Sequence, residues 1–500
     1  MAPSAKLPHL PRPLIPLLVA GALLAACGKT PSSPTSDGQP KEEPEAPPPV
    51  ADLIVRYIQR LPQMNWVPYS ADPTRDGWPA EGQDVTWTAH VLNRMPAAHE
   101  GVAYRWLLDG EEVAAGTVDL PAEGEATVAL PWSWTFDRHR LAFEIDPDDA
   151  IDEEARNNRL EVFTDALSVG FWVEQTVYDL AAQNQPGLGI GSTSFEDFAN
   201  RQIRYYNEMF QDAVYPETPD GVLDRLRVDE IVVVPDSSLP LVDIGYTGFD
   251  QGEATPDASD STVDLMWGFP VYVQSLFSAG SSQSDYSGFV QHEMGHARYL
   301  IDVNGLNVFQ STSGDSIGIL EDGEPVAGSV YMPWTTVNFN GKTGLQVYKA
   351  QPGLMNTQWD FLDRHSAGAL NRIAHHRAIA GSWNDPENTG EYLNDLPAQN
   401  RLLVTDFYGR PLPGASVDVY RSEHGEVVDS LDGYYKKYYD NTPDMVLTAD
   451  STGHVLLGRD PFGGIHQDMA FTNGTLIIRV EHEGAVGYGF LDVTGFNQAY

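Results

Sequence analysis

Apolar and polar residues alternate with different periods along the chain. From Ala51 to about Ala166, short runs rich in Val, Trp and Leu are separated by Gly, Pro and Asp, as in "DVTWTAHVLN" at residues 84–93. Alternation with a period of two is typical of strands with one buried face. The regular spacing of these runs predicts an all-β, Ig-like antiparallel sandwich over residues 51–166.

The period changes between residues 167 and 396. "TSFEDFANRQIRYYNEMFQDAVY" has helical apolar spacing at Phe195, Phe198, Ile203, Tyr206 and Phe210. Ser194 followed by Asp197 resembles a capping box with Asp in place of Glu or Gln. "RVDEIVVVPD" predicts a buried strand. Two more helices are predicted, in "YSGFVQHEMGHARYLIDV", which Asn304-Gly305 would stop, and in "DFLDRHSAGALNRIAHHRAIA". This mixture predicts an α+β body.

Strand-like runs return in residues 397–500 and predict a second all-β sandwich. The expected fold is therefore multidomain, with a sandwich at each end of an α+β body. "GQDVTWTAHVLNR", "WLLDGEEVAAGTVDLPAEGEATVALPW" and "DEEARNNRLEV" resemble the CARDB-type Ig-like domain, which implies an accessory module for spacing or adhesion. "GRPLPGASVDVYR" and "LTADSTGHVLLG" resemble the carboxypeptidase-regulatory-like, prealbumin-type sandwich.

The first residues predict export. The apolar run "LIPLLVAGALLAAC" is too short to span a bilayer, and small residues precede Cys27, so residues 1–27 are typical of a signal peptide. "LAAC" resembles the lipobox of bacterial lipoproteins, which implies that Cys27 is lipidated and anchors the chain to a bilayer. The alternative is an ordinary secretory signal with a chance cysteine. Because Gly28 follows, and not Asp, the outer membrane is the expected location where the cell has one. Residues 28–50, rich in Pro, Ser and acidic residues, predict a disordered tether.

The composition of the chain limits its binding partners and its disulfide bonds. The formal net charge of -41 predicts repulsion from nucleic acid, which we exclude as a partner. The mature chain cannot form an internal disulfide, because Cys27 is the one cysteine. Its domains must therefore be stabilised by hydrophobic cores.

The stretch "VQHEMGHARYLID" carries the candidate chemistry. His292 and His296 are four residues apart, so on a helix they project from one face and can bind one metal ion. Glu293 is placed to take a proton from water and to pass it to a leaving amine. This His-Glu-x-x-His motif resembles that of the zincin metallopeptidases, which implies a Zn²⁺ cofactor and a protein or peptide substrate. The plainer interpretation is an exposed helix with two His and a Glu.

The third zinc ligand has two main candidates. Metzincins extend the motif to His-Glu-x-x-His-x-x-Gly-x-x-His, and in the snapalysin-like branch the last His is Asp. Here Tyr299 stands at the glycine position and Asp302 at the ligand position. Asp302 can reach the metal only if the helix ends at residue 299. A glycine at that position would favour such an ending, but this chain has Tyr299. Otherwise Glu321 in "GILEDGEP", as in gluzincins, is the alternative, and Asp322 and Glu324 stay open.

Met355 in "QPGLMNTQWDFLD" resembles the Met-turn of metzincins, in which a methionine packs beneath the ligand histidines. The alternative is an ordinary core methionine. We interpret His365, His375 and His376 as surface or packing residues.

A cluster of acidic residues is a candidate Ca²⁺ site, but it does not match the spacing of an EF-hand loop, and a solvated acidic loop is the favoured interpretation. Its members are Asp243, Asp250, Glu253, Asp257, Asp260 and Asp264.

The sequence thus predicts a lipid-anchored cell-surface zinc metallopeptidase, a hydrolase that uses a metal-activated water. The alternative is a non-catalytic adhesin or scaffold with a degenerate zincin domain. The intact His292, Glu293 and His296 favour the enzyme. A peptidase that cuts only its own chain or one partner would have the same motifs.

Overall fold

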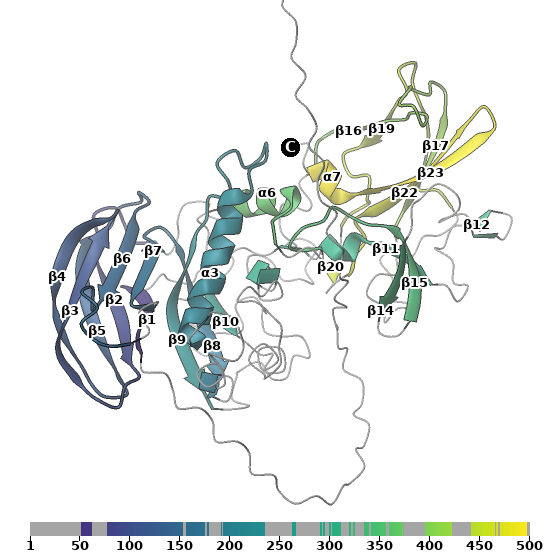
Figure 1. The fold of residues 1–500 in the computed structure, drawn as a ribbon. Helices are drawn as coiled ribbons and strands as arrows, with labels where there is room; N and C mark the ends of the chain where they lie inside the picture. Colours follow the sequence, from purple (N-terminus) through teal and green to yellow (C-terminus); the bar gives the residue numbers. More distant parts are fainter. Residues whose placement is uncertain are drawn as a thin grey trace, which may run out of the picture.

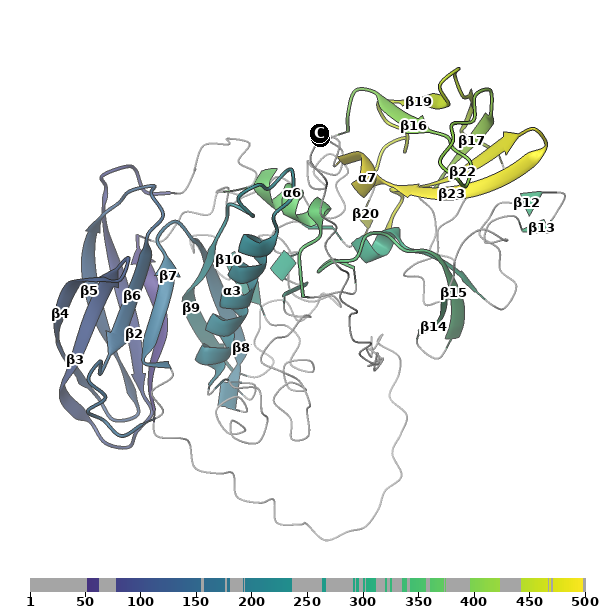
Figure 2. The same ribbon diagram turned by 45° about the horizontal axis from the view of Figure 1, so that its top comes forward.

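The computed structural model describes a chain that is mostly β-sheet with few helices in its described part. The described residues are 52–62, 78–153, 157–175, 178–179, 192, 194–235, 263–266, 291–292, 294–295, 300–301, 303–311, 320–321, 324–325, 335–339, 342–356, 360–372, 374, 396–422, 442–465, 467–468 and 471–497. Figure 1 shows a β-sandwich on either side of a middle segment, and Figure 2 shows the same order after a turn. Within the described residues, no helix has the length and apolar character that crossing a membrane requires.

Two antiparallel sheets form the N-terminal sandwich. One has the order β1 (Leu53–Leu61), β2 (Asp84–Asn93), β5 (Gly124–Ser133). The other has the order β4 (Glu111–Leu120), β3 (His99–Leu108), β6 (Arg140–Ile145), β7 (Arg159–Phe163). In β2 every second residue is buried, including Trp87, which shares a core with Trp106 and Trp134. Residues 84–93 therefore form a strand with one buried face, as their alternation predicted.

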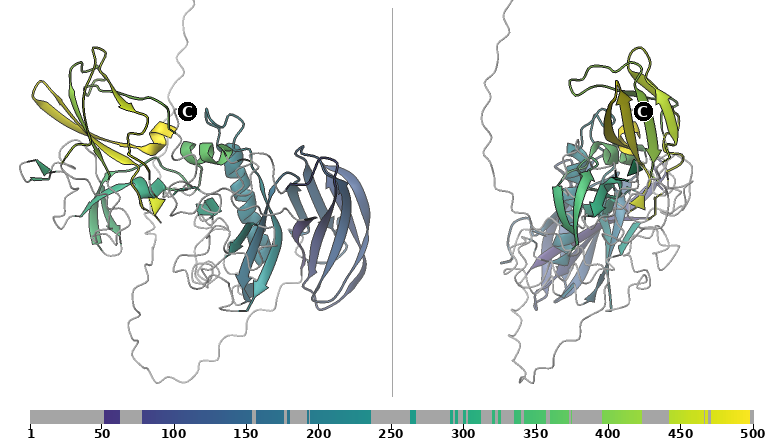
Figure 3. Two further views of the ribbon diagram at one scale, coloured as in Figure 1. Left: turned by 180° about the vertical axis from the view of Figure 1, so that it is seen from behind. Right: turned by 90° about the vertical axis from the view of Figure 1, so that its right-hand side faces the viewer.

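A small parallel sheet begins the middle segment. β8 (Leu167–Glu174) lies between β9 (Leu226–Val234) and β10 (Val263–Met266), and both neighbours run parallel to it. Helix α3 (Phe195–Asp212) lies beside this sheet, as Figure 3 shows from behind. The helix begins at the predicted cap, because the Ser194 hydroxyl accepts the N–H of Asp197 at 3.0 Å. The buried residues of α3 include those that the helical spacing predicted: Phe195, Phe198, Ile203, Tyr206 and Phe210.

The other described elements of the middle segment are short. The 3₁₀ turn η2 (Val303–Leu306) precedes an antiparallel sheet of β11 (Val308–Ser311), β15 (Lys342–Tyr348) and β14 (Thr335–Phe339). β12 (Leu320–Glu321) and β13 (Glu324–Pro325) form a short hairpin. Helix α6 (Arg364–Arg372) follows Asp363, whose carboxylate accepts the N–H of Ser366 at 2.9 Å.

The C-terminal sandwich has one four-stranded antiparallel sheet and two small ones. The large sheet has the order β18 (Met445–Thr448), β17 (Ser416–Arg421), β22 (Thr475–His482), β23 (Ala485–Asp492). β16 (Asn400–Leu403) pairs with β19 (His454–Gly458), and β20 (Gln467–Asp468) pairs with β21 (Phe471–Thr472). Helix α7 (Val493–Asn497) ends the described chain.

One hydrophobic core joins the middle segment to the C-terminal sandwich. It extends from Phe195 on α3 through Leu306 to Val493 on α7. A Cβ atom on Gly474 would lie 2.9 Å from the Val493 side chain and 3.2 Å from that of Leu306, so glycine permits this close approach. The Thr475 hydroxyl also donates to the Leu306 carbonyl at 3.2 Å. The two segments therefore share their interior.

Candidate metal centre

His292 is the member of the predicted histidine pair that the structure describes. It lies in a helical turn, and its ring is half-buried. The ring Nδ1 is 2.9 Å from the carbonyl oxygen of Leu354. Because a carbonyl can only accept a hydrogen bond, the neutral ring carries its proton on Nδ1 and its lone pair on Nε2. Nε2 is therefore the nitrogen that can bind a metal ion.

Gln291 also fixes this helical turn, by bonds to α3. Its buried side-chain amide donates to the backbone carbonyl of Gln202 at 2.9 Å and to the Gln202 side-chain oxygen at 3.0 Å. Gln202 lies on α3 and is also buried. The turn that carries His292 is thus held between α3 and Leu354.

Leu354 belongs to a turn at residues 350–356 that two buried asparagines hold together. The Asn356 amide nitrogen donates to the carbonyls of Ala350, at 3.0 Å, and Gln351, at 2.9 Å. The Asn307 amide nitrogen donates to the Asn356 side-chain oxygen at 3.0 Å. The Asn307 oxygen accepts the N–H of Ala350 at 2.9 Å. The conformation of the turn is therefore fixed by side chains from two segments.

Met355 packs directly against the His292 helix. Its side chain is fully buried, and its sulfur lies 2.7 Å from the point where a Cβ on Gly295 would stand. Glycine at 295 therefore lets the turn approach the helix backbone. The sequence predicted that Met355 lies beneath the histidines; the structure brings it to this helix, and its relation to a metal ion stays a prediction.

The helix is shorter than the sequence predicted. It was expected to continue to Asn304-Gly305, and this prediction is wrong, because Leu300 and Ile301 are no longer helical. The Leu300 N–H donates to the Gly295 carbonyl at 3.1 Å, a spacing typical of the bond that closes a Schellman helix ending.

The chain after this helix is held by the Met355 turn. The Asn304 N–H donates to the Met355 carbonyl at 2.8 Å, and Asn304 lies in the 3₁₀ turn η2. A helix that has ended by Leu300 meets one condition for the third-ligand hypothesis, because Asp302 on a continuing helix would lie off the histidine face.

Most of the predicted ligands fall outside the described residues. These are His296, Asp302 and the open candidate Asp322; the predicted general base Glu293 and Tyr299, at the glycine position of the motif, also lie outside the described residues. Glu321 lies in β12, where it pairs with Glu324 of β13, so it stands on a strand and not on a helix. Among the residues that the structure describes, no three His, Cys, Asp or Glu side chains gather as a metal-binding group. The ligand set therefore stays a prediction.

The other predicted sites are also mostly outside the described residues. Cys27 is outside, as are His375, His376 and the acidic cluster from Asp243 to Asp260. Asp264, the last member of that cluster, lies in β10. His365 lies on α6 and is buried, and burial lowers the pKa of its imidazole to about 3. It is neutral at physiological pH, as expected of a packing residue.

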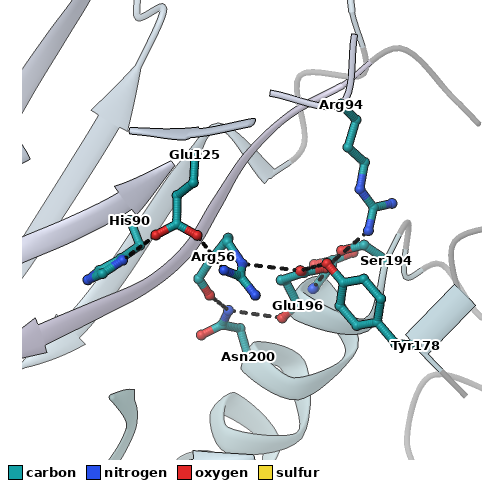
Figure 4. A network of polar contacts seen from close by, with 9 residues as sticks. Arg56, His90, Arg94, Glu125, Tyr178, Ser194, Glu196 and Asn200 are labelled. Atoms are coloured by element: carbon teal, nitrogen blue, oxygen red, sulfur yellow. Dashed lines mark hydrogen bonds and ion pairs between the residues drawn. The ribbon is translucent and has the colours of Figure 1, made fainter. Parts of the chain in front are cut away.

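A buried carboxylate joins α3 to the N-terminal sandwich (Figure 4). Glu196 is fully buried and accepts bonds from Arg56 Nε at 3.3 Å, from Arg94 at 3.2 Å and from the Tyr178 hydroxyl. Asn200, one helical turn later, donates to the Arg56 carbonyl at 2.7 Å. Burial alone would raise the pKa of the Glu196 carboxyl, but Arg94 and Arg56 hold it below its ordinary value. Glu196 is therefore an anion clamped between two guanidinium groups.

A second buried ion pair lies where β1 meets β9. Arg227 and Asp229 are paired and fully buried. Arg227 donates to the Ile58 carbonyl at 3.1 Å, and Asp229 accepts the N–H of Arg60 at 3.2 Å. The Arg60 guanidinium lies 4.6 Å from the Trp134 ring centroid, and burial lowers its pKa to about 9. The N-terminal sandwich is thus fixed to the parallel sheet by polar groups of both.

Two carboxyl groups at the start of the N-terminal sandwich have raised pKa values. Asp52 is buried and accepts from Asn157 at 2.8 Å, while Glu153 accepts from Asn158 at 2.6 Å. Burial, with the nearby Glu153 adding to it, raises the pKa of Asp52 to about 7. Burial also raises the pKa of Glu153 to about 7. Both groups therefore bind protons more tightly in the folded protein.

Comparison with known proteins finds likeness in solved structures. No protein-family model and no curated protein matches the sequence. The chain is similar to a CARDB domain of Pyrococcus furiosus, with 15% identity over 23% of this chain and 94% of that one, and a TM-score of 0.18. A crystal structure named as that CARDB domain with di-metal ions has 16% identity, covers 23% and 86%, and has a TM-score of 0.18. A domain of a protein of Methanosarcina acetivorans, named as a cell surface protein, has 22% identity, covers 23% and 90%, and has a TM-score of 0.17. These solved structures are thus named as CARDB domains and as a domain of a cell surface protein.

Proposed function

We propose that this chain is a zinc-dependent metallopeptidase held at the cell surface through a lipidated Cys27. One observation carries the proposal: a buried turn approaches the helix of the His-Glu-x-x-His motif from 62 residues away in sequence. The Leu354 carbonyl orients His292, and Met355 packs on Gly295. A carbonyl behind a histidine is the support that metal-ligating imidazoles use in proteins.

The residues of the chain divide the work as follows. His292 Nε2, His296 and Asp302 hold the ion, with Glu321 as the alternative third ligand. Zinc supplies Lewis-acid activation of water and of the peptide carbonyl. Glu293 takes the proton from the water and passes it to the leaving amine. The Leu354 carbonyl keeps His292 in one tautomer.

The segments around the site complete the proposal. Residues 167–396 form an α+β zincin-like body that resembles metzincins, and residues 397–500 form a prealbumin-like sandwich. The CARDB-like sandwich spaces the body from the membrane, and its contacts with Glu196 support a fixed orientation. The acidic cluster between Asp243 and Asp264 is the place where Ca²⁺ would bind. The location is the outer membrane, where the cell has one.

The test is to measure zinc per chain and peptide cleavage for the full chain in detergent. We expect about one zinc ion, and we expect His292→Ala to lose it. Glu293→Gln should keep the zinc and lower the cleavage rate by about 10²- to 10⁴-fold, since it removes the general base. A chain that holds no zinc at micromolar free zinc would contradict the proposal. That result would favour the alternative, a non-catalytic adhesin or scaffold, which the two flanking sandwiches would serve equally well.

A further inference from the structure

The amides of Asn307 and Asn356 leave little freedom to the turn at residues 350–356. Both side chains are buried, with exposed fractions of 2% and 0%. The Asn356 amide nitrogen serves two carbonyls, while its oxygen accepts from Asn307. Asn307 in turn serves the turn through the Ala350 N–H. Each amide thus donates and accepts at the same time.

These bonds require an amide at each position. An aspartate at 356 has nearly the same shape, but it would place a carboxylate oxygen against the carbonyls of Ala350 and Gln351. Two acceptors would then face each other in a buried site, and both carbonyls would lose their donor. An aliphatic residue would leave the same two carbonyls unsatisfied. The identity of Asn356 is therefore set by the backbone of the turn.

The turn delivers one group to the candidate metal centre, the Leu354 carbonyl. Its neighbours hold that carbonyl in place, since the Leu354 N–H donates to the Phe361 carbonyl at 2.8 Å and the Met355 carbonyl accepts from Asn304 at 2.8 Å. Met355 on Gly295 sets the distance between the turn and the helix. The position of the oxygen that meets His292 thus depends on the whole turn.

We infer that Asn307 and Asn356 are positioning residues of this centre: they fix the Leu354 carbonyl, which holds the His292 ring with its proton on Nδ1. The Nε2 lone pair then faces away from the turn and can bind a metal ion. The role in metal binding rests on the proposed function. The state of the His292 ring does not, and it can be measured without any metal.

The experiment is ¹⁵N NMR of the histidine rings in the metal-free full chain, with His292 assigned from its loss in His292→Gln. We expect His292 to be protonated at Nδ1 when it is neutral. Asn356→Asp should convert it to a mixture of the two tautomers. Asn207→Asp is the matched control, because Asn207 is also buried and bridges to the backbone of Leu226 at 2.8 Å, but on α3 and β9. It should leave the His292 signals unchanged.

Zinc affinity, measured by competition with a chromogenic chelator, is the second readout. We expect Asn356→Asp to weaken it by about 10- to 100-fold, and Asn207→Asp to leave it unchanged. A His292 ring protonated at Nε2 in the parent chain would overturn the inference, whether or not Asn356→Asp folds. An Asn356→Asp protein with the parent tautomer and affinity would overturn it too. A ring protonated at Nδ1 in a chain that binds no zinc would support the positioning role and contradict the proposed function.

Discussion

Replacing Glu196 by Gln tests whether charge joins the N-terminal sandwich to α3. The carboxylate is fully buried between Arg56 and Arg94, whose side chains are 13% and 12% exposed. Gln keeps the shape and removes the charge. Arg56 retains its pairing with Glu125, whereas Arg94 loses the carboxylate to which it is bound. The variant therefore leaves a largely buried guanidinium without its counter-ion.

The expected loss follows from this environment. Removing one partner of a buried ion pair costs about 3–5 kcal/mol. Since Arg56 keeps a second carboxylate and both guanidinium groups are slightly exposed, we expect the lower end, about 3 kcal/mol. In a unit of 150–250 residues this lowers the unfolding temperature by roughly 6–12 °C. The pKa of Glu196 is lowered from its ordinary value of 4.5 in the folded protein. The stability that the carboxylate contributes is therefore present above pH 4.5 and is lost as the pH falls through the lower folded pKa.

Calorimetry of the full chain at neutral pH measures this loss. Glu217→Gln is the control, because Glu217 pairs with Arg364, whose side chain is 34% exposed. A pair near the surface contributes at most about 1 kcal/mol, so the control should shift the unfolding temperature little. Equal shifts in both variants, or a loss below about 1 kcal/mol for Glu196→Gln, would refute the view that this buried pair fixes the two segments.

The remaining predictions concern stability and metal content. The folded pKa of Asp52 is about 7 against 3.8 in the unfolded chain, so the free energy of unfolding should fall as the pH rises from 4 to 7. Because Glu153 has a raised pKa as well, Asp52→Asn should reduce this slope in thermal unfolding without removing it, and an unchanged slope would contradict the prediction. Gly295→Ala places a Cβ 2.7 Å from the Met355 sulfur and should destabilise the chain by about 1–3 kcal/mol. Met355→Ala should recover part of that loss, and purely additive losses would contradict the contact. Asp302→Ala should lose bound zinc and Glu321→Ala keep it, as measured by metal analysis; the opposite result would make Glu321 the third ligand.

Local periodicity predicted the elements that bury one face. In α3 the spacing of Phe195, Phe198 and Phe210 predicted the helix and its buried side, because residues at this spacing lie on one face of a helix. β2 could be predicted in the same way, since alternation with a period of two depends only on which face of the sheet is covered. The end of the His292 helix was not predictable in this way, because the chain that follows it is held by the distant Met355 turn, through the bond from Asn304 to the Met355 carbonyl.

In the candidate site, too, short motifs could be predicted and contacts between distant residues could not. His292 and Met355 could be identified from short motifs, but the bond between His292 and Leu354 joins residues 62 apart. The amide pair of Asn307 and Asn356 joins residues 49 apart, and single asparagines near turns carry no signal for it. The stretch "PGLMN" includes Asn356, but its resemblance to a Met-turn identified only the methionine. Partners of this kind are selected by topology, which no local pattern contains.

The core shared through Leu306, Gly474 and Val493 also affects the order in which the segments fold. The interior around Leu306 and Gly474 cannot close until Val493 has arrived. Contacts between residues so far apart in sequence slow folding. A chain that is exported across a membrane with its N-terminus first would therefore have an open middle segment until its last strands have crossed the membrane. During that interval the N-terminal sandwich can already be folded, and the exposed apolar surface is the part that aggregation or proteolysis would reach first. Loss of the final helix would accordingly prolong this vulnerable interval for the middle segment as well.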